Sequence, residues 1–372
     1  SEGGAEIESE IDHDLEFSHS SFLGWSTENH AGQSVSIAGD VNGDGFDDIL
    51  IGSYGYTDGS DMIGMVYLLL GNEDGWNRNI PLYHYADASF YGEYHNDYAG
   101  YSLSGAGDVN DDGYDDFLIG AHLNDEGGVY GGQVYLFFGK ESGWSRFTNL
   151  SSADASFIGS AYQGLGKGLS GLGDVNGDGI DDFAIGAPNG YSYNGVTYVF
   201  FGNSGGWQMD MNMTNADVYY TGGYNNKLGE TLTEVGDVNN DGYNDILIGS
   251  YDLTYGKAYL VLGRSSNWSS GSISSKGLMF YSNEYNSGAG FVAGPGDVNG
   301  DGYDDILIGA PHSDPKGDSS AGQTYLIFGK ESGWSGTRYL SDSDASFTGE
   351  GSSQNSGYAV SKAGDMNGDG YA

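Results

Sequence analysis

A nine-residue acidic stretch that recurs along the chain constrains its fold more than any other feature. The first copy, from Asp40 to Asp48, reads Asp-Val-Asn-Gly-Asp-Gly-Phe-Asp-Asp, and Ile-Leu-Ile-Gly follows it at once. Nearly the same stretch starts again at Asp108, Asp174, Asp237 and Asp297, and a sixth copy begins at Asp365. Successive starts lie 60 to 68 residues apart. The chain is therefore one structural unit repeated in series.

Each acidic stretch carries oxygen donors at the spacing that a calcium ion requires. Calcium takes about six to eight oxygen ligands from carboxylates, amides and main-chain carbonyls. Positions 1, 3, 5 and 9 offer side-chain oxygens, and position 7 is expected to offer its carbonyl. The predicted ligands are Asp40, Asn42, Asp44, Phe46 and Asp48; Asp108, Asn110, Asp112, Tyr114 and Asp116; Asp174, Asn176, Asp178, Ile180 and Asp182; Asp237, Asn239, Asp241, Tyr243 and Asp245; Asp297, Asn299, Asp301, Tyr303 and Asp305; and, in the incomplete sixth copy, Asp365, Asn367 and Asp369.

The residues between the donors separate this loop from its closest rivals. Position 6 is Gly in every copy, which permits the positive φ needed to fold the loop around one point. An EF-hand loop, and similarly a dockerin-like loop, needs an acidic residue at position 12, whereas the five complete copies all have Ile there. Ordinary Asp- and Gly-rich turns are the other alternative, and five copies with the same donor positions favour a metal-binding loop over such turns.

The acidic or amide residue at position 8 is expected to be solvated or to support the ligands: Asp47, Asp115, Asp181, Asn244 and Asp304.

Four short strands, A to D, are predicted in each repeat. In the second repeat they cover residues 100–107, 116–120, 133–139 and 155–159, and the acidic loop joins A to B. Strand C is an almost unbroken apolar run, so both of its faces must be covered. Four-stranded antiparallel sheets packed face to face, one for every ~60 residues, are the blades of a β-propeller. The predicted fold class is therefore all-β.

The repeat resembles the FG-GAP repeat of the integrin α-chain propeller and its prokaryotic relatives. The motifs that carry the resemblance are Phe90-Tyr91-Gly92, Phe157-Ile158-Gly159 and Phe347-Thr348-Gly349 at strand D, and Gly120-Ala121-His122, Gly186-Ala187-Pro188 and Gly309-Ala310-Pro311 after strand B. The resemblance implies calcium in the A–B loops and seven blades. Ser replaces Ala in Gly52-Ser53-Tyr54 and Gly249-Ser250-Tyr251, and the absence of Cys favours a microbial relative.

The domain prediction is an acidic flexible tail at residues 1–16 followed by the propeller at 17–372. The propeller is expected to be incomplete at its C-terminal end, because only five sets of strands A to C are complete. Either further residues or a neighbouring chain would supply the remainder, and further residues are favoured. The segment Phe22-Leu23-Gly24 is expected to act as strand D of the last blade and close the ring.

The charge of the chain restricts its partners. Its formal net charge is −41, from 53 acidic and 12 basic residues, which argues against nucleic acid or an anionic membrane as a partner. No run of apolar residues is long enough for membrane insertion. The loop composition suits the calcium concentration outside cells, so the predicted location is extracellular or at the cell surface.

The two rims of the propeller are predicted to differ. Strand directions alternate, so A–B and C–D loops share one rim, here called the acidic rim, while B–C and D–A loops share the opposite rim. Three glycosylation sequons, at Asn149, Asn212 and Asn267, fall in C–D loops. Loops rich in Tyr, Asn, Gly and Ser on the opposite rim have the composition of a recognition surface. The Trp residues that follow strand C are predicted to pack between blades: Trp76, Trp144, Trp207, Trp268 and Trp334.

Three functions remain open from the sequence. The first is a non-enzymatic, calcium-stabilised recognition or adhesion propeller that binds a protein or glycan through the opposite rim. The second is a structural subunit that self-associates into a surface filament or layer. The third is a propeller-based enzyme acting on polysaccharide, which the scattered repeat positions of the seven His residues disfavour.

Overall fold

The structure is a computed structural model that describes residues 20–26, 28–59, 61–251, 255–365 and 372. The predicted acidic tail at residues 1–16 and two predicted ligands of the sixth loop, Asn367 and Asp369, lie outside these residues. The domain boundary at residue 17 therefore stays a prediction.

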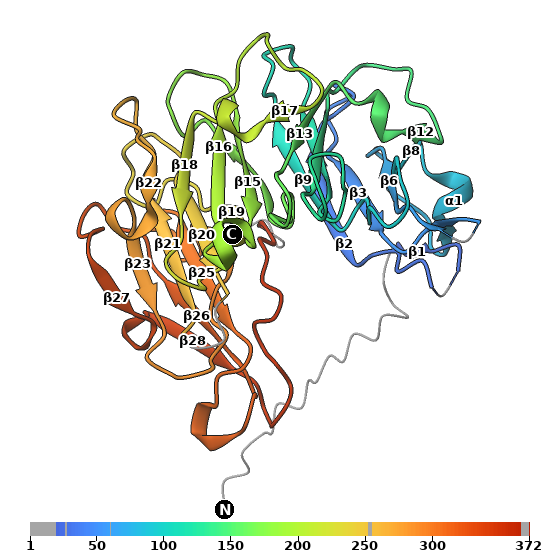
Figure 1. Ribbon diagram of the computed structural model, residues 1–372. Coiled ribbons are helices and arrows are strands. Elements are labelled where there is room, and N and C mark those ends of the chain that lie inside the picture. Colours follow the sequence, from blue (N-terminus) through green and yellow to red (C-terminus); the bar gives the residue numbers. More distant parts are fainter. Residues whose placement is uncertain (1–19, 27, 60, 252–254, 366–371) are drawn as a thin grey trace, which may run out of the picture.

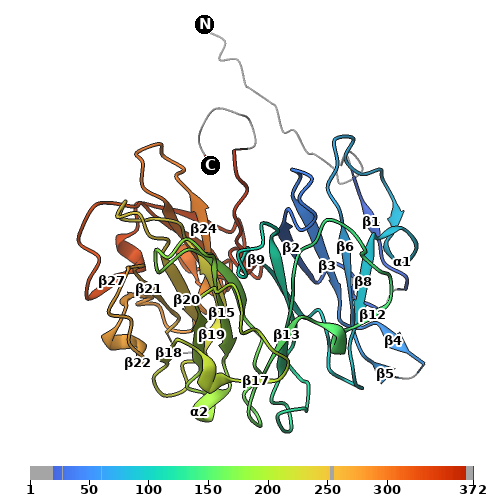
Figure 2. The same ribbon diagram turned by 90° about the horizontal axis from the view of Figure 1, so that it is seen from above.

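Five successive sheets form the blades, which lie side by side in chain order in Figures 1 and 2. In each blade strands A, B, C and D pair in that order and antiparallel. Strands A are β2 (Ser34–Gly39), β9 (Ser102–Gly107), β14 (Leu169–Gly173), β19 (Leu228–Glu234) and β24 (Phe291–Gly296). Strands B are β3 (Asp48–Ser53), β10 (Asp116–Ala121), β15 (Asp182–Ala187), β20 (Ile246–Ser250) and β25 (Asp305–Ala310). The all-β propeller prediction is confirmed, and each strand A contacts the strand A of the next blade.

The outer half of each blade is formed by strands C and D. Strands C are β6 (Met65–Leu69), β11 (Gln133–Phe137), β16 (Val196–Phe200), β21 (Lys257–Val261) and β26 (Gln323–Ile327). Strands D are β8 (Ala88–Tyr91), β13 (Ala155–Ile158), β18 (Val218–Thr221), β23 (Leu278–Tyr281) and β28 (Ala345–Thr348). Strands C are buried along most of their length, as their apolar sequences require.

A fifth, parallel strand that the sequence did not predict extends the first four blades. The C–D connection of the following blade supplies it, so each blade holds its neighbour by main-chain hydrogen bonds. These strands are β12 (Thr148–Asn149), β17 (Met211–Asn212), β22 (Gly271–Ser272) and β27 (Thr337–Tyr339). In the same way β7 (Ile80–Pro81) pairs with β1 (Phe22–Leu23). The N-terminal strand β1 therefore stands where the strand D of a preceding blade would stand, and closure of the ring stays a prediction.

The remaining elements are short and lie in the loops. A small hairpin is formed by β4 (Thr57–Asp58) and β5 (Asp61–Met62). The helices are α1 (Leu82–Tyr85) and α2 (Gly190–Tyr193), with single 3₁₀ turns at Leu150–Ser152, Met213–Asn215, Ile273–Ser275, Pro315–Gly317 and Leu340–Asp342. No helix within the described part of the chain is long and apolar enough to cross a membrane.

The core lies between the blades, where Phe90 and Phe157 of the Phe-x-Gly motifs meet the next sheet, whereas Phe347 of the last blade is exposed. Phe90 of strand D packs against Phe137 of the following blade, with the two ring centroids 4.6 Å apart. Phe157 repeats this contact with Phe200 at 4.7 Å. Trp144, Trp207, Trp268 and Trp334 pack against the apolar clusters that join consecutive blades, as predicted. Trp76 packs against Phe22 of β1 in the same manner.

The Gly that opens each Gly-Ala or Gly-Ser motif is required by close contact between blades. A Cβ added to Gly186 would lie 2.0 Å from the main-chain oxygen of Gly229 in the next blade. The corresponding clashes at Gly52, Gly120, Gly249 and Gly309 involve oxygens 2.0–2.5 Å away. Any side chain at these positions would push two blades apart.

We expect Gly186→Ala to destabilise the protein by about 1–3 kcal/mol, because the added methyl group overpacks a backbone contact. Chemical denaturation measures the change in unfolding free energy. Gly205→Ala is the matched control, since a Cβ there meets no atom within 4 Å, and equal destabilisation by both variants would contradict this explanation of the motif.

The loop arrangement agrees with the prediction of two distinct rims. On the acidic rim, the N–H of Lys140 in a C–D loop donates to the carbonyl of Val41 in the preceding A–B loop at 2.8 Å. On the opposite rim, the B–C residue Asn124 donates to the D–A residue Asp97 at 3.0 Å. Two of the sequon residues, Asn149 and Asn212, lie in β12 and β17 within the C–D connections.

Candidate metal centre

The Asp at position 1 organises each acidic loop. In the first loop its two carboxylate oxygens accept the N–H groups of Asp44 at 2.9 Å and Gly45 at 2.8 Å. The same two bonds, at 2.7–3.1 Å, form at Asp108, Asp174, Asp237 and Asp297. The position 5 carboxylate accepts the N–H of position 7, as Asp44 does from Phe46 at 3.0 Å. Each loop is therefore bent so that its acidic side chains face its own backbone.

Two residues per loop take a left-handed backbone conformation, which sets the bend. Position 6 is the predicted Gly, with φ between +88° and +92° in the five described loops. Position 4 also has positive φ, and there two loops use Asp111 and Asn240, at +60° and +56°, instead of Gly. Asp and Asn tolerate this conformation better than other residues that carry a Cβ.

The Asp at position 9 is fully buried and ties the loop to strand C. Asp182 accepts the N–H of Val175 at 3.0 Å and that of Gly202, after strand C, at 2.8 Å. Equivalent pairs of bonds form at Asp48, Asp116, Asp245 and Asp305. Burial raises the pKa of Asp116, Asp182 and Asp245 to about 8, and that of Asp48 and Asp305 to about 6. Without a cation, the charged form of these carboxyls is costly to bury.

Two buried oxygens at position 3 lack a partner within the protein. The side-chain Oδ1 atoms of Asn110 and Asn239 are buried and accept no hydrogen bond. In the first, third and fifth loops the corresponding Asn oxygen accepts the N–H of position 5 at 2.8–3.0 Å. An unsatisfied buried oxygen lowers the stability of the folded state. A cation bound in each of these two loops would satisfy its Asn oxygen.

The protein alone does not gather the carboxylates at one point. Among the described residues, no three His, Cys, Asp or Glu side chains are close enough together to hold a metal ion. The hydrogen bonds described above explain this, because the Asp oxygens are directed at N–H groups of the loop. The donor types at positions 1, 3, 5, 7 and 9 nevertheless suit a hard cation such as calcium, and the number of filled sites stays a prediction.

Three of the position 8 carboxylates support the adjacent loop, which is one of the two roles expected for them, whereas Asp47 is exposed. Asp115 accepts the N–H of Asp40, at position 1 of the preceding loop, at 2.8 Å. Asp181 and Asp304 make the same contact with Asp108 and Asp237 at 3.0 and 2.8 Å. These carboxylates connect the acidic loops of adjacent blades, so one loop supports the next.

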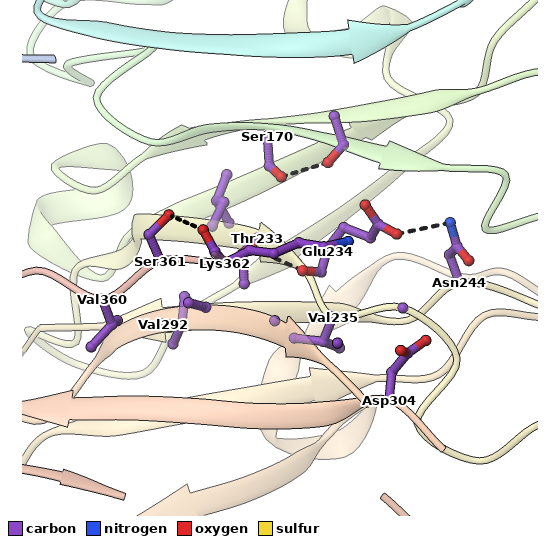
Figure 3. Close-up of a pocket in the computed structure, with 16 residues that line it drawn as sticks. Ser170, Thr233, Glu234, Val235, Asn244, Val292, Asp304, Val360, Ser361 and Lys362 are labelled. Atoms are coloured by element: carbon purple, nitrogen blue, oxygen red, sulfur yellow. Dashed lines mark hydrogen bonds between the residues drawn. The ribbon is translucent and has the colours of Figure 1, made fainter. Parts of the chain in front are cut away.

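Asn244 replaces this Asp in the fourth blade, and a neighbouring charge explains the replacement. Its amide donates to the Glu234 carboxylate at 3.1 Å, as Figure 3 shows, in a cavity also lined by Asp304 and Lys362. Glu234 stands where the second, third and fifth blades have Gly105, Gly171 and Gly294. Burial raises the pKa of Glu234, and the charge of Lys362 opposes that rise. An Asp at 244 would place a second carboxylate against Glu234.

Sequence reasoning missed two groups of residues that complete the loops. One is the Gly after strand C, whose N–H binds the position 9 carboxylate: Gly71, Gly139, Gly202, Gly263 and Gly329. The other is the Val at position 2, buried in the first four loops and half-buried at Val298, which supplies the second N–H to the same carboxylate. Both recur in every complete repeat, and that recurrence was the available signal.

Comparison with known proteins matches the repeats to one family. The FG-GAP repeat model matches residues 31–69, 99–137, 169–200 and 289–327. Integrin alpha-PS2 of Drosophila melanogaster is 31% identical over 245 residues, 63% of this chain and 16% of that protein. Integrin alpha-8 of Gallus gallus is 28% identical over 243 residues, 64% of this chain and 21% of that protein.

A third relative carries the name of an enzyme. Phosphatidylinositol-glycan-specific phospholipase D of Bos taurus is 35% identical over 179 residues, 46% of this chain and 21% of that protein. The chain thus spans about a fifth of the length of these relatives. Four matched repeats, the repeated blades and the similarity to integrin α-chains together identify the chain as an integrin-like FG-GAP repeat β-propeller.

Proposed function

We propose that the chain is a calcium-stabilised recognition propeller that works outside cells or at their surface and binds a protein or glycan ligand through its opposite rim. The similarity to integrin α-chains supports an adhesion role. The proposed function is binding alone, without catalysis. The match to the phospholipase D named above covers only a fifth of that enzyme.

The uneven distribution of exposed tyrosines is the observation that carries the proposed ligand rim. Seven of the ten exposed tyrosines in the described residues lie in B–C or D–A loops: Tyr94, Tyr130, Tyr162, Tyr193, Tyr224, Tyr285 and Tyr358. Tyr85 and Tyr339 lie in C–D connections, and Tyr219 lies in β18. Tyr offers a large contact area at low entropy cost. The opposite rim therefore has the composition of a binding surface.

Calcium would contribute rigidity to this surface from the other rim. In each loop the side chains at positions 1, 3, 5 and 9 and the carbonyl at position 7 would hold the ion, with five complete sets from Asp40 to Asp305. A bound ion neutralises the buried position 9 carboxylate, which also binds the end of strand C. The blades would thus be fixed in the relative positions that align the opposite-rim loops.

A glycan array, together with a panel of extracellular proteins, tests for a ligand on this rim. We expect Tyr224→Ser to weaken binding of the ligand so identified by about tenfold, because exposed aromatic residues contribute strongly to interfaces. Tyr224 is 92% exposed, so the substitution should leave the fold intact. Tyr85→Ser, at a residue 68% exposed on the acidic rim, is the matched control. Loss of binding with Tyr85→Ser but not with Tyr224→Ser would contradict the assignment of the rim.

A further inference from the structure

An Asp near the start of strand D recurs in four of the five blades but not in the fourth. Its carboxylate accepts the N–H of the residue that follows strand C, at 2.9 Å in all four cases. The pairs are Asp87 with Leu70, Asp154 with Phe138, Asp217 with Phe201 and Asp344 with Phe328. In the fourth blade the Asp is replaced by Gly277. The corresponding N–H, that of Leu262, therefore receives no such carboxylate.

A cavity lies where this carboxylate is missing. Its volume is about 450 Å³. It lies between β21, β23 and the segment that leads into β27, and these three strands are neighbours in Figure 1. Leu262 and Gly277 line it together with Arg264, Lys276 and Trp334. Hydroxyl groups are contributed by Ser274, Ser275, Ser335 and Thr337, and none of the lining residues is acidic. We refer to it as the fourth-blade cavity.

The surroundings of the cavity are positively charged in a strongly acidic chain. Four of the twelve basic residues, Arg264, Lys276, Lys330 and Arg338, lie in it or against its Trp334 wall. The ion pairs within 4 Å among the described residues are His95 with Asp61 and Lys167 with Glu230, so none of the four is paired in this way. Nitrogens Nε of Arg264 and Nη1 of Arg338 are buried without a hydrogen-bond partner.

Two of these cations, Lys330 and Arg338, lie close enough together to repel each other. Lys330 and Arg338 lie over the Trp334 ring at 5.4 and 5.5 Å. The pKa of Lys330 is lowered by burial and then by the Arg338 charge, while Asp344 opposes the shift. The charges of Lys330 and Arg338 therefore repel each other beside the Trp334 ring.

Comparison with the other blades shows that the fourth blade differs in charge at two adjacent residues, 276 and 277. Residues 153–154 and 216–217 are Ala-Asp in the second and third blades, whereas residues 276–277 are Lys-Gly. The exchange removes one negative charge and adds one positive charge beside an N–H that elsewhere binds a carboxylate. A cation above a Trp is not unusual here, since Lys140 lies 4.6 Å from the Trp144 ring in the second blade. The Lys-Gly pair distinguishes the fourth blade.

We propose that the fourth-blade cavity binds an oxyanion, a sulfate, phosphate or carboxylate group, in the place of the missing Asp side chain. The N–H of Leu262 and the side chains of Lys276 and Arg264 would donate to it. Charge-assisted hydrogen bonds of this kind are the strong ones. The oxyanion is either a free ion or a substituent on a larger ligand such as an acidic saccharide. This site is separate from the opposite rim and does not depend on the function proposed for it.

Titration of the whole chain with sodium sulfate, followed by the amide NMR signal of Leu262, tests the site. Sodium chloride at equal ionic strength is the reference. We expect a saturable shift with sulfate and none with chloride. Lys276→Ala, which removes a donor, and Gly277→Asp, which restores the carboxylate, should each weaken sulfate binding by about tenfold or more. Lys140→Ala, at the equivalent of Arg264 in a blade that retains its Asp, should bind sulfate as the parent does.

Equal sulfate binding by the parent, Lys276→Ala and Gly277→Asp would overturn the proposal, as would a shift of equal size with chloride. A Cβ at 277 would lie 2.8 Å from the Leu260 oxygen, so Lys276→Ala decides the test if Gly277→Asp folds poorly. A sulfated monosaccharide separates the two sources of the oxyanion. Tighter binding than that of inorganic sulfate supports an ester ligand, and equal binding supports a free ion.

Discussion

Removal of calcium with EDTA is expected to lower the melting temperature by roughly 10 °C or more at pH 8. Each complete loop then holds three Asp carboxylates without a counterion, and ligands that bind only the folded state stabilise it by mass action. The decrease in melting temperature should be largest at a pH high enough to ionise the buried position 9 carboxyls. Differential scanning calorimetry with and without calcium measures it.

The pH dependence of the calcium-free protein provides a check with a definite sign. The pKa values of Asp116, Asp182 and Asp245 are raised from 3.8 to about 8 in the folded state. The folded state therefore binds more protons than the unfolded state between about pH 4 and pH 8, so its stability falls as the pH rises through this window. Calcium should remove most of this fall by favouring the ionised form. A melting temperature in EDTA that is independent of pH, or unchanged by calcium, would contradict this account.

Asp182→Ala is expected to destabilise the protein by about 2–5 kcal/mol even in EDTA. The substitution removes the acceptor of two buried N–H groups, those of Val175 and Gly202, and each unsatisfied buried group costs about 1–3 kcal/mol. The substitution is therefore expected to lower the unfolding free energy both through these lost hydrogen bonds and through the loss of a calcium ligand. Chemical denaturation in EDTA and in calcium measures both parts.

Asp178→Ala is the matched control for this prediction. Asp178 is also a predicted ligand, but it is exposed and its carboxylate accepts the N–H of Ile180 within the loop. We expect it to reduce the stabilisation by calcium while changing the stability in EDTA little. If Asp182→Ala is as stable as Asp178→Ala in EDTA, the buried carboxylate does not hold loop and strand together.

The repeat made much of the fold predictable from the sequence. Residues 116–120 and 133–139 were expected as strands, and β10 and β11 cover Asp116–Ala121 and Gln133–Phe137. Local patterns sufficed because each strand is short, apolar and bounded by Gly. Positive φ at position 6 was predictable for the same reason, since Gly stands there in every copy.

Contacts between repeats were not predictable in the same way. The two residues of β12 carry no strand pattern, and their pairing with β8 depends on how neighbouring blades pack. The hydrogen bond from the Asp40 N–H to the Asp115 carboxylate joins residues 75 positions apart, so the sequence did not show that this carboxylate supports the loop of the preceding blade. The directions of the loop carboxylates likewise depend on which N–H groups the fold brings near them.

Crystallography of the protein in millimolar calcium tests the central claim most directly. We expect anomalous difference peaks in the five complete loops, each about 2.3–2.6 Å from oxygens at positions 1, 3, 5, 7 and 9. The oxygens of Asn110 and Asn239, which lack a hydrogen-bond partner here, should then contact an ion. Loops that keep their internal Asp-to-backbone hydrogen bonds and show no peak at that calcium concentration would contradict it.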